Sequence, residues 1–263
     1  MSASFTLIKG TSPLLISMPH NGQAIPEDIA KTMTESAKKI ADTDWYKDRL
    51  YDFANVQGAN ILMPKYNRYV IDLNREPTGI DLYPGQNSTE LCPTSAFDLT
   101  PLYLSEQQPD EKEIQHRITH YWQPYHDALR NRLTEIKQQF GYAILLEAHS
   151  ILSHVPRFFE GQLPDFNFGT ANGKSCSNKL ITEIEQLDYS PYSIVSNGRF
   201  KGGFITRHYG DPENNIHAIQ LELSQRTYMN ESTNEYNEVL ARQVKPKLEA
   251  LVQCLLNTSQ PTS

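Results

Sequence analysis

Two histidines stand at the ends of apolar runs that are typical of buried strands. His20 follows the run 14–18, and His149 closes the run 143–149. Ligands of open α/β sheets bind beyond the carboxyl ends of the strands. Imidazole is a good zinc ligand, and catalytic zinc takes three protein ligands and keeps one position open for water. Either histidine alone could simply bond to backbone, but two of them, each followed by a small polar residue, favour a metal site.

The third ligand of such a site is open between two carboxylates. Asp44 begins a helical stretch, where a carboxylate can also serve as a cap. Glu147 lies two residues before His149, so both side chains face one side of their strand, where Glu147 could bind metal or orient the histidine. Gln23, three residues after His20, carries a neutral amide and is a poor ligand. We rank Asp44 first and Glu147 second.

Arginines flank a further predicted strand, residues 68–73. Asp72 interrupts its apolar positions, and because an isolated buried carboxylate is costly, we expect Asp72 to belong to an Arg–Asp network. For Arg68 and Arg75 the pattern favours binding of a carboxylate or an oxyanion, since a planar guanidinium donates several hydrogen bonds at once.

A segment bounded by Gly202 and Gly210 carries another arginine, Arg207. Glycines allow close approach of the backbone and movement, so Arg207 could close over a substrate carboxylate. An exposed arginine on a surface turn is an equally good interpretation of the same residues.

Glu222 lies inside an apolar strand, residues 217–223. Burial of an isolated glutamate is costly, so this carboxylate is either salt-bridged or acts as a general base. Beside a metal-activated water it would accept a proton during attack and return it to a leaving amine. The sequence contains no His-Glu-x-x-His, CxxC pair, Gly-x-Ser-x-Gly, Walker A loop or GxGxxG.

The elements that must position these residues alternate between short apolar and longer amphipathic runs, which is typical of an α/β protein. Strands are predicted at 14–18, 59–63, 68–73, 142–149, 165–168, around 194 and at 217–223, with the second and third forming a hairpin. Helices are predicted at 32–53, 111–140 with a kink or break at Pro124, 177–187 and 234–256. Residues 76–110 contain five prolines and little periodicity, which predicts a functional lid or rim. Residues 257–263 are expected to be a frayed tail.

Composition narrows the class of protein. The 263 residues can form one α/β domain with a sizeable core. A net charge of −7 argues against a nucleic-acid partner, so any cationic site must be local. No run approaches the roughly 20 apolar residues that span a bilayer, and the N-terminus does not have the pattern of a signal peptide. Three scattered cysteines form neither a disulfide framework nor a metal cluster. We expect a cytoplasmic protein without a membrane partner.

Six segments together resemble the N-formylglutamate amidohydrolase family. They are SMPHNG (17–22), DTDWYKDRL (42–50), NRYVIDLNR (67–75), EAHS (147–150), KGGFITRHYG (201–210) and QLELSQRTYM (220–229). Any one of them would be a weak signal, but the ordered set is specific, and the resemblance extends from about residue 5 to 250. It implies one catalytic domain over residues 1–263 with a three-layer α/β/α fold and a mixed, mainly parallel sheet, similar to the fold of zinc carboxypeptidases and aspartoacylases.

The resemblance also implies roles for individual residues. It makes His20 and His149 zinc ligands, Glu222 the base, and Asn74 with Arg75 the pair that binds a substrate carboxylate. Arg68 would polarise the scissile carbonyl. The sequence departs from the carboxypeptidase His-x-x-Glu pattern at position 23, so the choice between the two candidate carboxylates stays open.

The leading hypothesis is zinc-dependent hydrolysis of N-formyl-L-glutamate to formate and L-glutamate, the last step of one route of histidine degradation. The reaction needs an activated water, an electrophilic stabiliser and a proton shuttle. A small acidic N-acyl amino acid also needs cationic anchors, for which Arg68, Arg75 and Arg207 are available. The alternative enzyme is a zinc carboxypeptidase or peptidoglycan-type amidase, which a longer, open groove would favour. A non-catalytic carboxylate-binding module is disfavoured because Glu222 and His149 are both present. The preferred acyl group, the native metal and the oligomeric state stay open.

Overall fold

The computed structural model describes residues 4–79 and 87–258. In this part of the chain, seven strands form one sheet in the order β1-β3-β2-β4-β7-β5-β6. Their bounds are β1 Phe5–Ile8, β2 Leu14–Ser17, β3 Asn60–Pro64, β4 Ala143–Ile151, β5 Phe166–Gly169, β6 Ile194–Ser196 and β7 Ile216–Ser224. The central strands β3, β2, β4 and β7 run parallel, whereas β1 and β5 run antiparallel to their inner neighbours.

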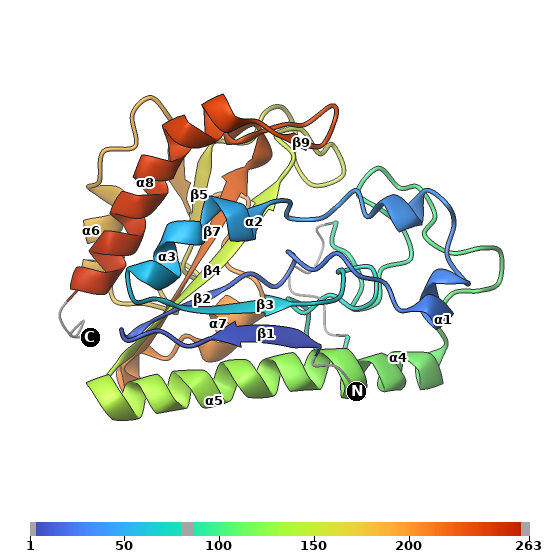
Figure 1. Ribbon diagram of the computed structural model, residues 1–263, viewed down its shortest axis with the longest axis horizontal. Helices are drawn as coiled ribbons and strands as arrows, with labels where there is room; N and C mark the ends of the chain where they lie inside the picture. Colours follow the sequence, from blue (N-terminus) through green and yellow to red (C-terminus); the bar gives the residue numbers. More distant parts are fainter. Residues whose placement is uncertain (1–3, 80–86, 259–263) are drawn as a thin grey trace.

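Helices cover both faces of the sheet, with α8 and α5 on opposite sides of it in Figure 1. One hydrophobic cluster joins a face of the sheet to α2 Lys47–Leu50, α3 Asp52–Val56, α6 Asn178–Glu185 and α8 Glu238–Asn257. A second cluster joins the other face to α5 Gln123–Phe140 and α7 Phe204–Tyr209. The predicted three-layer α/β/α fold with a mixed, mainly parallel sheet is confirmed.

Shorter elements complete the described chain. They are α1 Glu27–Ala30, α4 Glu111–Arg117, 3₁₀ turns at Ala37–Lys39, Pro212–Asn214 and Gln225–Thr227, a π-helical turn at Ile118–Trp122, and the strand pair β8 Met229–Asn230 and β9 Glu235–Tyr236.

Strands β2 and β4 are apolar along most of their length because both of their faces are covered. In β2, Leu14 and Ile16 belong to the core beneath α8, and Leu15 belongs to the core against α5. Burying each such side chain stabilises the fold by about 1.5–3 kcal/mol. Polar residues are therefore tolerated mainly where the strands leave the core, and His20 and His149 mark that edge of the sheet.

Residues 32–53 do not form the single helix that was predicted. They contain one 3₁₀ turn, the helix α2 and the start of α3. Ile40 and Tyr46 adopt left-handed backbone conformations, with φ of 47° and 58°, and each interrupts a helical path. The chain turns at these points instead of continuing as a rod, and this brings Asp44 back to the end of β2, where its N–H donates to the carbonyl of His20.

Residues 68–73 form turns, so the predicted strand and hairpin are wrong. Two side chains in or beside this segment accept hydrogen bonds from backbone N–H groups close by in the sequence. In a strand, backbone groups would pair with a neighbouring strand instead. Asn67 Oδ1 accepts from the N–H of Tyr69, and Asp72 Oδ1 accepts from the N–H of Asn74. The strand before this segment, β3, instead pairs in parallel with β2.

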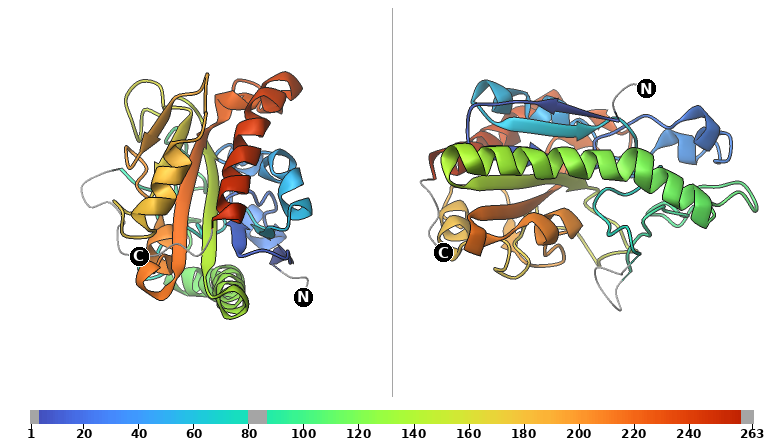
Figure 2. Two further views of the ribbon diagram at one scale, coloured as in Figure 1. Left: turned by 90° about the vertical axis from the view of Figure 1, so that its left-hand side faces the viewer. Right: turned by 90° about the horizontal axis from the view of Figure 1, so that it is seen from below.

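The long predicted helix is interrupted as expected near Pro124. Helix α4 passes through the π-helical turn into α5, whose first turn contains the proline, and Figure 2 shows the two helices following one another along the molecule. Gly141, with φ of 83°, ends α5. None of the helices in residues 4–79 and 87–258 combines the length and apolar character that a membrane span requires.

The predicted lid or rim contains no helix or named strand in its described residues, 76–79 and 87–110. Residues 80–86 of that segment and 259–263 of the predicted tail lie outside the described residues. The prediction of a frayed tail is wrong for the two tail residues that are described, because Asn257 ends α8 and Thr258 is buried and accepts from the hydroxyl of Tyr142. The glycine-bounded loop at 202–210 contains helix α7.

Candidate active site

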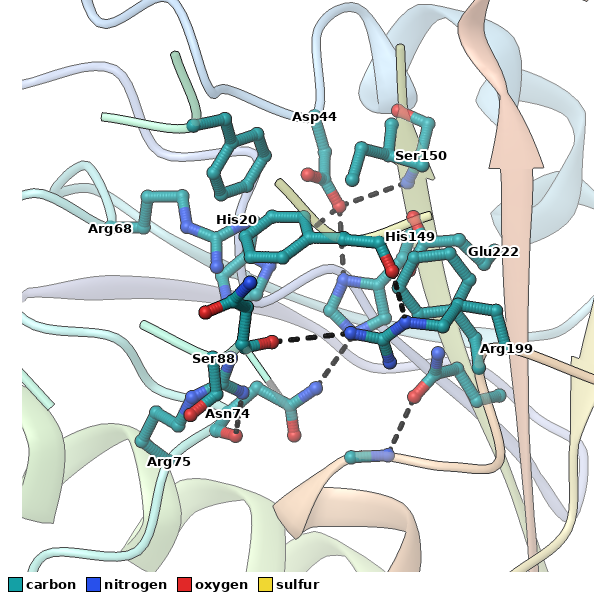
Figure 3. A pocket seen from close by; sticks show the side chains of 17 residues that line it. His20, Asp44, Arg68, Asn74, Arg75, Ser88, His149, Ser150, Arg199 and Glu222 are labelled. Carbon is teal, nitrogen blue, oxygen red and sulfur yellow. Dashed lines mark hydrogen bonds and ion pairs between the residues drawn. The ribbon is translucent and has the colours of Figure 1, made fainter. Parts of the chain in front are cut away.

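A cluster of two histidines and one carboxylate lies near the carboxyl ends of β2 and β4 (Figure 3). His20 comes from the turn after β2, Asp44 from the segment before α2, and His149 from β4. Asp44 Oδ2 lies 3.0 Å from His149 Nδ1 and 3.9 Å from His20 Nδ1. All three residues are buried, and one ligand atom of each lies within 4.8 Å of the others, so the cluster could hold a metal ion.

The opposite nitrogen of each imidazole bonds to a different carboxylate. His20 Nε2 lies 2.7 Å from Asp72 Oδ1, and His149 Nε2 lies 2.6 Å from Glu147 Oε1. A carboxylate that accepts the Nε2 proton fixes the ring and leaves Nδ1 as the electron-pair donor. Two imidazoles and one carboxylate that face a common point form a donor set typical of catalytic zinc.

Geometry distinguishes the two candidate third ligands. Glu147 lies on the far side of the His149 ring, and its second oxygen accepts from both the N–H and the hydroxyl of Thr206. Asp44 faces the Nδ1 atoms of both histidines and is fixed by the N–H of Ser150 at 3.0 Å. Glu147 is thus placed to orient His149, and Asp44 is placed to bind a cation.

The charges around the cluster also favour a cation. Burial disfavours the charged imidazole of His149, but the carboxylates of Glu147 and Asp44 outweigh burial and raise its pKa to about 10. Burial and the charge of Arg68 lower the pKa of His20, so its imidazole is neutral, as metal binding requires. Although burial opposes ionisation of Asp44, its bond to His149 and the positive charges nearby hold its pKa below the ordinary value. The surroundings that favour a proton between His149 and Asp44 also favour a metal ion there.

Glu222 stands beside His149, because the two residues are paired in the register of β4 and β7. Burial is the main reason that the pKa of Glu222 rises to about 8, and the charge of Asp44 adds to this effect. A carboxyl group with a pKa near neutrality can both accept and release a proton.

Lys47 is a component of the site that sequence reasoning missed. Its ammonium is fully buried and donates to the carbonyl of His149 at 2.9 Å. Burial lowers its pKa to about 8, while Asp44 and Glu222 oppose that shift. In the sequence, Lys47 resembles a solvent-facing residue on a charged helix, so only its placement beneath the cluster identifies it.

The segment around residue 72 positions three predicted site residues. Arg68 Nη2 donates to Asp72 Oδ2 at 2.6 Å, which confirms the expected Arg–Asp network. Arg75 donates to the carbonyl and hydroxyl of Thr89 at 2.9 and 3.1 Å. Asn74 Oδ1 accepts from the N–H of Ile205 at 2.9 Å. Arg68, Asn74 and Arg75 all line the same pocket as the histidines.

The structure does not bring Arg207 into that group. Arg207 is exposed on α7, its Nε donates to the carbonyl of Gly202 at 2.8 Å, and it is absent from the described lining of the pocket. Another arginine, Arg199, lines the pocket instead. The sequence around Arg199 reads as an ordinary loop and carries no signal that separates it from the other arginines.

The space between the lining residues of the pocket amounts to about 590 Å³, including open solvent at its mouth. We call His20, Asp44, His149 and Glu222 its floor. We call the residues at its mouth the rim, which comprises Asn87, Ser88, Phe97, Phe158, Arg199 and Phe200. Three rim residues belong to the segment that was predicted to be a lid or rim.

A buried His–Asp–His cluster beside a carboxyl group of near-neutral pKa, in a pocket lined by arginines, has the groups that a hydrolase of small anionic compounds needs. The sequence profile described as N-formylglutamate amidohydrolase matches residues 12–229. The chain belongs to the N-formylglutamate amidohydrolase family, as the six sequence segments predicted, and is a hydrolase of amide bonds.

Relatives support this assignment over nearly the whole chain. The chain is 46% identical to an N-formylglutamate deformylase of Pseudomonas putida and 45% identical to one of Pseudomonas aeruginosa, over 94% of each chain in both cases. A crystal structure of an N-formylglutamate amidohydrolase from Ralstonia eutropha matches with a TM-score of 0.81 and 27% identity, covering 95% of this chain and 97% of that one. A gene product of Agrobacterium tumefaciens, 14% identical with a TM-score of 0.70 over 97% of this chain and 96% of that one, shows the same fold.

Proposed function

We propose that this protein hydrolyses N-formyl-L-glutamate to formate and L-glutamate, with one zinc ion held by His20, Asp44 and His149. The observation that carries the proposal is the convergence of these three side chains with Glu222 in one arginine-lined pocket. The names of the relatives at 45–46% identity support the choice of substrate.

The chain supplies a complete set of orienting groups for the metal. Asp72 and Glu147 contact the Nε2 atoms, and both Nδ1 atoms lie on the side of Asp44. When bound, zinc would lower the pKa of a water molecule and polarise the formyl carbonyl.

Glu222 is the proposed proton carrier. It accepts a proton from the attacking water as the water oxygen bonds to the formyl carbon. As the C–N bond breaks, Glu222 returns that proton to the nitrogen, which leaves as the amine of glutamate. A pKa of about 8, raised mainly by burial, lets one carboxyl group perform both transfers. The guanidinium of Arg68 donates to the carbonyl oxygen as negative charge develops there.

Asn74 and Arg75 are the proposed partners of the α-carboxylate of the substrate. Arg75 is fixed by Thr89, so its side chain loses less conformational entropy when a substrate binds. The predicted role of Arg207 in carboxylate binding receives no support from its exposed position on α7.

We further propose that one catalytic domain over residues 1–263 acts in histidine degradation in the cytoplasm. The three cysteines are all free thiols, which suits a reducing compartment. Its partner is a small acidic N-acyl amino acid; neither nucleic acid nor membrane has a part in the proposal.

The test combines metal analysis with a formate-release assay on N-formyl-L-glutamate and on its N-acetyl and formimino counterparts. We expect one zinc per chain, highest kcat/KM on the N-formyl compound, loss of activity with a chelator and recovery on adding zinc. Preference for the C-terminal bond of peptides or for peptidoglycan fragments would instead identify the alternative enzyme class. Full activity after complete metal removal would reject the zinc site.

A further inference from the structure

Arg199 enters the pocket from the side opposite to the segment 68–75. It lies in the loop between β6 and α7, and Figure 3 shows its guanidinium directed into the pocket. Its Nε donates to the carbonyl of Phe158 at 2.6 Å, and its Nη2 donates to the carbonyl of Asn87 at 3.2 Å. Two rim segments that are distant in sequence thus fix the position of one guanidinium.

Aromatic rings add to this restraint. The guanidinium carbon lies 5.9 Å from the centre of the Phe158 ring and 5.4 Å from that of Phe200. Arginine commonly lies against aromatic faces while its N–H groups remain directed to the side. A guanidinium restrained in this way can select an anion by position as well as by charge.

The proposed substrate carries two carboxylates, and the pocket provides cationic groups on two sides. Arg68 is paired with Asp72 beside the floor, and Arg75 is held at Thr89. Both belong to one segment and lie near the reacting groups, where the α-carboxylate must also lie because it is attached to the carbon that bears the amide nitrogen. The side-chain carboxylate, further along the substrate, then extends toward the opposite side of the pocket.

We propose that Arg199 binds the side-chain carboxylate of the substrate and so selects N-formylglutamate over analogues with a neutral or shorter side chain. The inference rests on the proposed function and assigns to Arg199 the role that sequence reasoning gave to Arg207. The proposal predicts that kcat/KM depends on both the charge and the length of the substrate side chain, because a fixed guanidinium cannot follow a carboxylate that is one methylene closer to the backbone.

The decisive experiment compares wild type and Arg199→Met on N-formyl-L-glutamate and N-formyl-L-glutamine, which share shape but differ in side-chain charge. A charge-assisted hydrogen bond is worth enough to predict a roughly 10- to 100-fold loss of kcat/KM on N-formylglutamate, mostly through KM. For N-formylglutamine we expect kcat/KM to be nearly the same in the variant and in wild type. Equal losses on both substrates would overturn the proposal, because they would show that Arg199 only maintains the rim.

Two further measurements separate recognition of charge from a change in the shape of the pocket. Arg199→Lys keeps the charge without the planar donors, so it should recover part of the discrimination. Calorimetric binding of L-glutamate and L-glutamine needs no turnover, and Arg199→Met should weaken only the former. If wild type does not hydrolyse N-formylglutamate, the proposed function fails, yet selective loss of glutamate binding would still support Arg199. Unchanged glutamate binding would overturn its role.

Discussion

The floor and the rim of the pocket hold their charged side chains by different means. On the floor, each histidine is fixed by a carboxylate: His20 by Asp72 and His149 by Glu147. At the rim, Arg199 is held by the backbone carbonyls of Phe158 and Asn87, which are uncharged oxygens. The floor is therefore a network of opposite charges in a buried environment, whereas the described hydrogen bonds of Arg199 at the rim go to backbone carbonyls.

This difference suits the two tasks of the site. Opposite charges in a buried network interact strongly, so the floor can hold a cation and shift the pKa of a carboxyl group. A guanidinium at the rim can bind an anionic ligand through its planar set of donors. We therefore expect changes on the floor to remove metal or catalysis, and changes around the mouth to alter binding of particular substrates.

The largest expected effect separates the two candidate metal ligands. Asp44→Ala should abolish stoichiometric zinc binding and activity, because it removes the oxygen that faces both Nδ1 atoms. Glu147→Ala should keep zinc but weaken its affinity by about 10- to 100-fold, as is typical for groups that orient a ligand. Competition with a chelator measures both affinities. If Glu147→Ala abolished zinc binding and Asp44→Ala only weakened it, Glu147 would be the ligand.

The next largest effect concerns the proton carrier. Glu222→Gln keeps the shape of the side chain but removes the proton acceptor, so kcat should fall by about 10²- to 10⁴-fold. Zinc content and substrate KM should change little, because the residue lies outside the proposed ligand set. Steady-state kinetics with metal analysis tests this, and near-normal kcat in the zinc-loaded variant would contradict the role of Glu222.

A smaller effect is expected when Arg75 is replaced: a loss of binding free energy that is restricted to substrates with an α-carboxylate. Arg75→Met should weaken binding of N-formyl-L-glutamate by about 2–5 kcal/mol, since an anion would lose its partner in the pocket. A matched control is 4-formamidobutanoate, which keeps the distal carboxylate and lacks the α-carboxylate. We expect KM for this compound to be nearly unaffected. Similar losses on both compounds would indicate that Arg75 supports the fold around Thr89.

The smallest effect concerns a buried histidine that has no carboxylate partner among its described hydrogen bonds. His126 contacts the hydroxyl of Tyr209 and the carbonyl of Leu73, both at 2.9 Å. Burial lowers its pKa to about 3. Below the unfolded-state pKa near 6.5, the unfolded chain binds more protons at this position than the folded chain. The free energy of unfolding should therefore decrease by up to about 1.4 kcal/mol per pH unit as pH falls from 6.5 toward 3.

Urea unfolding of wild type and His126→Gln at pH 7 and pH 5 tests this expectation. The variant should be less stable at pH 7, because it disturbs both hydrogen bonds, but its stability should decrease less between the two pH values. An identical decrease in both proteins would mean that other groups cause the acid sensitivity.

The main features of the fold and floor could be predicted because they follow from burial. Central parallel strands are covered on both faces, so β2 and β4 are nearly continuous apolar runs, and polar residues at their ends are conspicuous. His20, His149 and Glu222 were identifiable for this reason. The segments 32–53 and 68–73 were mistaken for regular elements because the left-handed conformations of Ile40 and Tyr46 and the local side-chain bonds of Asn67 and Asp72 leave no trace in hydrophobic periodicity.

By itself, the amino-acid sequence determined the α/β class, the edge of the sheet that carries the candidate site and seven of the 17 described residues that line the pocket there. The tertiary structure alone decided that Asp44 faces both histidines while Glu147 supports one of them, that Lys47 is buried beneath the floor, and that Arg199 lines the pocket while Arg207 lies on the exposed surface of α7. The physical reason is that burial leaves a pattern along the chain, whereas the direction of a charged side chain depends on which distant segments supply its hydrogen-bond partners.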